Sequence, residues 1–196
     1  MELNDEPMTG EQSLQLISEM ITAAKTGIKD DGFFYLLWGW LVLVASLSQY
    51  ALLFIWPSEY NGLPWAILMP LGGVVTMIAS RRQKKKRKVK TFLDQFMGYA
   101  LVAFLMSLFT VLFFMARLGR PELAYPLIMM VYGAWLFISG GALKFKLLMV
   151  GGIINWALAF AAMFVPFQGQ LLLLALAVLL GYIIPGHLLK SGYQQE

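Results

Sequence analysis

The chain has 196 residues, of which 59% are hydrophobic and 13% are charged, and its formal net charge is +4. A typical soluble domain is about 45–50% apolar and about 25% charged, so this chain would expose large apolar patches in water. With no cysteine and a single histidine, His187, the sequence excludes disulfides, thiolate metal sites, a cysteine nucleophile and histidine-rich metal sites.

Residues 1–32 predict a cytoplasmic acidic tail followed by an amphipathic helix. Apolar side chains recur there at helical spacing and form one stripe: Leu14, Ile17, Ile21, Ala24 and Ile28. Seven acidic residues against two lysines give the segment a charge of −5, and an anionic membrane surface would repel it. Asp30, Asp31 and Gly32 predict that this helix ends before the first span. The stripe then rests on the lipid interface, on the bundle or on a second protein.

A transmembrane helix needs about 20 mostly apolar residues. Six stretches satisfy this requirement: 33–56, 64–80, 93–116, 123–143, 147–165 and 170–189. The connections between them are short, which forces neighbouring helices into antiparallel hairpins. The sequence therefore predicts an all-α polytopic membrane protein: a six-helix transmembrane domain over residues 33–189, preceded by a cytoplasmic amphipathic helix.

The stretch SRRQKKKRKVK, residues 80–90, joins the second and third spans through a basic loop, 81–92. Its eight basic residues are Arg81, Arg82, Lys84, Lys85, Lys86, Arg87, Lys88 and Lys90. One side of the predicted bundle holds 13 Lys and Arg residues and the other holds two, Arg117 and Arg120. The positive-inside rule then places both termini, including the tail 190–196, in the cytoplasm.

Such a basic run is also typical of nuclear localisation signals and nucleic-acid patches. Here it is tethered between two spans, so it cannot follow a nucleic-acid groove, and no nucleic acid is expected as a partner. Contact with anionic lipid headgroups or with the acidic N-terminal helix is predicted instead.

Ionisable residues inside spans usually mark function, and these spans contain almost none. No catalytic constellation, metal site or cofactor motif is predicted. Asn155, with Trp156 and Trp135, is the candidate for a polar contact at mid-membrane depth. An interhelical hydrogen bond and a contact to a ligand or ion are the two interpretations.

Residues 12–50 carry an S-L-x-L-I-x-x-M-I-x-x-A-K helix that runs into F-x-Y-L-L-W-G-W. This pattern resembles a family of small, uncharacterised integral membrane proteins of Bacteroidota. The resemblance covers about the first quarter of the chain and implies a bacterial inner membrane. It implies no activity and no catalytic residue.

These observations favour a non-enzymatic accessory, scaffold or regulatory subunit of the inner membrane. Its partners would be the lipid bilayer, anionic headgroups, and a cytoplasmic protein or further copies of the chain. The alternative is a small transporter, or a membrane protein that binds a hydrophobic ligand or lipid, with its site near Asn155, Trp156 and Trp135.

Overall fold

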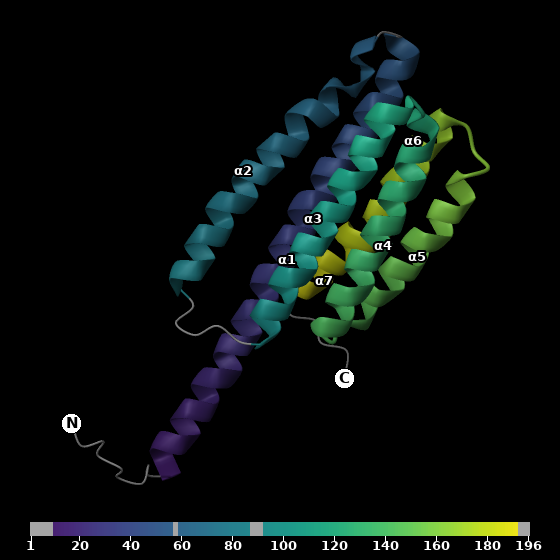
Figure 1. Cartoon of the computed structure of the whole chain (residues 1–196). Helices are drawn as coiled ribbons and strands as arrows, with labels where there is room; N and C mark the ends of the chain where they lie inside the picture. Colours follow the sequence, from purple (N-terminus) through teal and green to yellow (C-terminus); the bar gives the residue numbers. More distant parts are fainter. Residues whose placement is uncertain (1–9, 57–58, 87–91, 192–196) are drawn as a thin grey trace.

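The computed structural model describes residues 10–56, 59–86 and 92–191, and its regular structure there is helical throughout (Figure 1). The α-helices are α1 (Gly10–Ile55), α2 (Leu63–Lys86), α3 (Phe92–Leu118), α4 (Ala124–Ala142), α5 (Lys146–Ala162), α6 (Phe167–Val178) and α7 (Ile184–Ser191). Short 3-10 turns, η1 (Glu59–Gly62) and η2 (Pro121–Leu123), precede α2 and α4. A π-helical segment, η3 (Leu179–Ile183), joins α6 to α7.

Five described segments are long and apolar enough to cross a membrane. They are Gly32–Ile55, Tyr60–Gln83, Phe92–Leu118, Ala124–Ala142 and Phe167–Ser191. The apolar helix α5 is shorter than these. All six stretches predicted as spans are therefore helical, close to their predicted limits, and the chain carries several membrane-compatible helices. The number that cross a membrane stays a prediction.

The largest departure from the sequence prediction is the continuity of α1. The break predicted at Asp30, Asp31 and Gly32 is wrong, because one helix of 46 residues runs from Gly10 to Ile55. Gly32 serves close packing instead: a Cβ atom there would lie 2.9 Å from the Lys190 backbone nitrogen and 3.2 Å from the Gly186 carbonyl oxygen of α7. The part of α1 before Gly32 extends beyond the bundle (Figure 1).

A second departure concerns the basic loop. Residues 81–86 continue α2 as helix, so the connection to α3 is shorter than the predicted loop 81–92. Lysine and arginine are good helix formers, and their charged ends can reach water beyond the apolar part of the helix. Arg87, Lys88 and Lys90 lie outside the described residues.

Successive long helices run in opposite directions, as the short connections predicted (Figure 1). The start of α1, the α4–α5 turn and the end of α7 lie toward one end of the bundle. In the described chain this end carries Arg81, Arg82, Lys144, Lys146 and Lys190, and Arg117 at the end of α3 belongs to the opposite one. The fold therefore separates the two sets of basic residues.

The buried core lies among α1, α4, α5, α6 and α7. Its fully buried side chains include Met129, Leu136, Leu148, Leu171 and Leu174. The helix α2 packs against α1, and α3 packs against α4, but α3 has no buried residue. These two outer helices present apolar side chains outward, as expected for surfaces that face lipid.

Glycines allow the core helices to approach at backbone distance. A Cβ on Gly151 of α5 would lie 2.8 Å from the Cα of Gly181, and one on Gly152 would lie 2.7 Å from the carbonyl oxygen of Gly133 on α4. Small residues at helix contacts are the usual means of tight packing in membranes, where apolar burial gives no driving force. α5 is thereby held between α4 and η3.

The π-helical turn before Pro185 has a direct covalent cause. Proline has no N–H and its ring crowds the carbonyl four residues earlier, here that of Gly181. The chain responds with a wider turn, in which the Ile184 N–H donates to the Leu179 carbonyl, five residues back. This turn brings Gly181 against α5.

The contact at Gly181 yields a first prediction. A Cβ there would meet Asn155 Nδ2 at 2.5 Å and Leu136 Cδ1 at 2.8 Å, so Gly181→Ala should destabilise the fold by about 1–3 kcal/mol through overpacking. Gly73→Ala is the matched control, because nothing lies within 4 Å of the added methyl group. Thermal unfolding in detergent compares the two; equal midpoints would contradict the proposed contact.

Candidate functional site

Asn155 is the polar centre of the buried core. Its side chain is fully buried, and its Nδ2 donates to the Gly151 carbonyl at 2.9 Å and to the Ala177 carbonyl of α6 at 3.1 Å. The predicted interhelical hydrogen bond is therefore present. Within the described structure, Asn155 Oδ1 is buried without a hydrogen-bond partner. Asn155 links α5 to the helix that carries the π-helical turn.

Three buried tyrosines lie where α1, α4 and η3 meet. The Tyr182 ring lies 5.5 Å from that of Tyr132 and 6.1 Å from that of Tyr35, between ring centroids. The Tyr182 hydroxyl is buried with no hydrogen-bond partner among the described atoms. No local pattern in the sequence predicts this cluster, because the three residues are far apart in the chain.

The three side chains of the predicted trio have different partners. Trp156 is 39% exposed, and its Nε1 donates to the Met130 carbonyl of α4 at 3.0 Å. Trp135 points to α3, with its ring 5.2 Å from that of Phe104. Asn155, by contrast, faces α6. The two tryptophans thus fasten α4 to α5 and to α3.

A second polar cluster lies toward the opposite end of the bundle from the α1 extension. Gln49 is 7% exposed, and its Oε1 accepts hydrogen bonds from Trp65 Nε1 at 2.7 Å and from the Tyr125 hydroxyl. One amide therefore connects α1, α2 and α4. Nearby, Gln170 Nε2 donates to the Ala162 carbonyl at 3.1 Å and closes the α5–α6 turn. No local pattern around Gln49 in the sequence predicts this role, because its partners come from other helices.

The remaining predicted contact residues lie toward the end where α1 projects. Arg81 and Arg82 are exposed near the end of α2; Lys84, Lys85 and Lys86 continue that helix. The positions of the predicted docking stripe, Leu14, Ile17, Ile21, Ala24 and Ile28, all lie on the α1 extension, but their side chains are outside the described part of the structure. Contact between this extension and the basic run stays a prediction.

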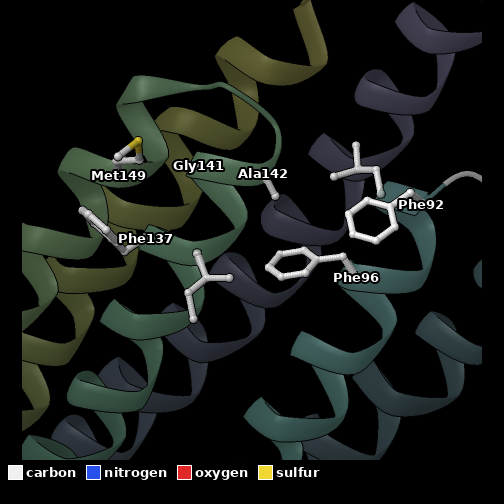
Figure 2. A pocket seen from close by; sticks show the side chains of 8 residues that line it. Phe92, Phe96, Phe137, Gly141, Ala142 and Met149 are labelled. Carbon is white, nitrogen blue, oxygen red and sulfur yellow. The ribbon is translucent and has the colours of Figure 1, made fainter.

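An apolar groove of about 470 Å³ opens between the start of α3 and the α4–α5 hairpin (Figure 2). Phe92 and Phe96 of α3 lie on one side, and Phe137, Ala142 and Met149 line the other. Every lining residue is apolar or glycine. The groove can accommodate hydrocarbon, but it offers no polar side chain that would orient a reacting group.

The chemistry of these sites is that of neutral amides, phenols and indoles. Such groups join helices through hydrogen bonds and can hold a water-sized polar molecule. No cluster of three or more His, Cys, Asp or Glu residues that could hold a metal occurs in the described ranges. In this structure these groups join α1, α2, α4, α5 and α6 through hydrogen bonds.

Comparisons with protein families, with curated proteins and with solved structures found no match.

Asn155 gives the second prediction. Asn155→Leu keeps the approximate volume and removes both hydrogen bonds, so it should reduce stability by about 1 kcal/mol, the usual scale for such bonds in membranes. Ser107→Ala on α3 is the control, because the Ser107 hydroxyl donates only within its own helix, to Ala103 at 2.8 Å, in an exposed position. Unfolding by denaturing detergent should show a larger loss of stability for Asn155→Leu than for Ser107→Ala. Equal losses of stability in the two variants would show that Asn155 does not stabilise the contact between α5 and α6.

Proposed function

We propose that this chain is a bacterial inner-membrane protein with six transmembrane helices and both termini in the cytoplasm. It acts as a non-enzymatic accessory, scaffold or regulatory subunit whose cytoplasmic face meets a protein partner. The observation that carries the proposal is the continuity of α1 from Gly10 into the bundle. The membership in a Bacteroidota family, suggested by residues 12–50, belongs to the same proposal.

The length of the extension favours docking over a surface-lying helix. Twenty-two residues separate Gly10 from Gly32, which corresponds to about 33 Å at 1.5 Å per residue. A helix that continues directly from a span leads away from the bilayer, whereas a helix that lies on lipid must turn at the interface. The acidic charge of residues 1–32 also disfavours adsorption to anionic lipid.

The spacing within the extension fits a helical partner. Stripe positions recur after three and four residues, which is the spacing of the contact positions in a coiled coil. Docking of an amphipathic helix through such positions is a common mode of recognition. A cytoplasmic protein of complementary apolar surface fits this face, and the basic residues at the end of α2 add charge that anionic headgroups can bind.

The packing of the core gives little support to the transporter alternative. The continuous helix α1 gives more support to docking. Large apolar side chains and close glycine contacts fill the space beside Asn155. Two hollows in the described structure are mainly apolar grooves toward one end of the bundle. Those grooves do favour the narrower alternative of hydrophobic-ligand or lipid binding.

A crosslinking experiment tests the docking face, and it is our third prediction. A photoreactive residue at position 21, on the stripe, should give an adduct with a partner protein in intact cells. Position 26 lies five residues along, about 140° around the helix, and should give little. An adduct with a second copy of the chain would identify self-association as the docking mode. Equal yields at both positions, or none at either, would contradict docking through the stripe.

The orientation gives the fourth prediction. The chain has no cysteine, so single cysteines report topology without background. A membrane-impermeant maleimide added to intact spheroplasts should label Gln168→Cys, at the exposed α5–α6 turn. Gln83→Cys and Ser191→Cys should react only after the membrane is opened. Labelling of position 83 or 191 in sealed spheroplasts would reverse the proposed orientation.

A further inference from the structure

A second groove, of about 400 Å³, follows one face of α1 between α2 and α7. Its α1 lining comes from Phe33, Leu36, Leu37, Trp40, Leu41 and Val44. These positions are separated by one, three and four residues and therefore share one side of the helix. Leu68 of α2 lies on one flank and Lys190 of α7 on the other. The groove is thus a continuous apolar strip with one cationic residue.

The length of the strip matches one leaflet. Eleven residues separate Phe33 from Val44, which corresponds to about 16 Å along the helix. The hydrocarbon core of a bilayer is about 30 Å thick, so a leaflet supplies about half of that. Trp40 and Val44 remain 48% and 47% exposed, which leaves the strip open to a chain that lies along it. An acyl chain fits this length and is already part of the leaflet, whereas a partner helix would have to insert into the bilayer to reach the strip.

Positive charge gathers at one end of the strip. Lys190 is exposed in the last turn of α7, where its backbone packs on Gly32, next to Phe33. On the other flank, Trp38 Nε1 donates to Thr76 Oγ1 at 3.1 Å and fixes the register of α1 with α2. The two helices are antiparallel, so positions six residues from this bond in each helix lie level with each other along the bundle. Arg82 follows Thr76 by six residues, and Gly32 precedes Trp38 by six residues, so Arg82 lies level with Gly32.

We propose that this groove binds one anionic glycerophospholipid. One acyl chain lies along the apolar face of α1, and the phosphate group contacts Lys190. Arg82 of α2 lies at the same level along the bundle. Basic residues at the mouth of a crevice between transmembrane helices are a recurrent arrangement for anionic headgroups. Asp30 and Asp31 precede Gly32 in the sequence, and Lys190, the charged residue that lines the groove, gives the site its preference for an anionic headgroup.

This inference goes beyond the proposed docking function, because it needs a membrane but no protein partner. It also holds for either orientation, since the site faces whichever leaflet contains Lys190. A crosslinking experiment that finds no docking partner would therefore not contradict the lipid site. A failure to detect lipid binding would likewise not contradict docking through α1.

Native mass spectrometry of the full chain tests the headgroup contact. The purified protein is titrated with phosphatidylglycerol and, separately, with phosphatidylcholine of the same acyl chains. Lys190→Gln should weaken binding of the first phosphatidylglycerol about fivefold and leave phosphatidylcholine unchanged. Lys146→Gln is the matched control, because Lys146 is an exposed lysine toward the same end, at the start of α5, and lines neither groove. Equal effects of the two substitutions would overturn the proposal.

The acyl-chain contact is tested by filling the groove. Val44→Trp should reduce binding of both lipids several-fold, because the larger side chain occupies the inner part of the strip. Val150→Trp on α5 controls for the added indole, since Val150 is 49% exposed and lies outside the groove. Unchanged lipid binding by Val44→Trp, or an equal loss in both tryptophan variants, would show that bound lipid is not held in this groove.

Discussion

The close contact of α1 with α7 is the constraint on which the proposed role depends. At Gly32 the backbone of α7 approaches so nearly that a side chain would collide with it, and at Gly39 an added Cβ would meet Ile183 of η3, just before α7, at 2.8 Å. These two positions hold one face of α1 against the bundle and leave the helix straight where it emerges. The same contact sets the height of Lys190 beside the lipid groove. One packing arrangement therefore governs both proposed contacts.

The sequence predicted the elements of the fold well. Hydrophobic length located the helical stretches, since a membrane-compatible run differs sharply from the polar turns around it. Short connections predicted the antiparallel hairpins, and Asn155 was correctly singled out as a buried hydrogen-bonding residue. Each of these inferences depends on a local property, either the composition of one segment or one polar residue in an apolar run.

The relations between elements could not be predicted in the same way. Gly32 after two aspartates is typical of a helix end, and only the position of α7 shows that it serves close packing. The Gln49 amide and the Tyr182 ring acquire their roles from residues of other helices. The π-helical turn likewise places Gly181 against Asn155, a consequence of Pro185 that local propensity does not express.

A spin-label distance distinguishes an α1 that continues across the edge of the bundle from a helix that is broken there. Labels at Gln15→Cys and Val44→Cys in the cysteine-free chain, measured by double electron–electron resonance in lipid nanodiscs, should lie about 43 Å apart in one narrow distribution. A helix broken at Asp30–Gly32 and laid at a right angle on the membrane would give about 31 Å. The shorter distance would show that α1 is not continuous across the edge of the bundle.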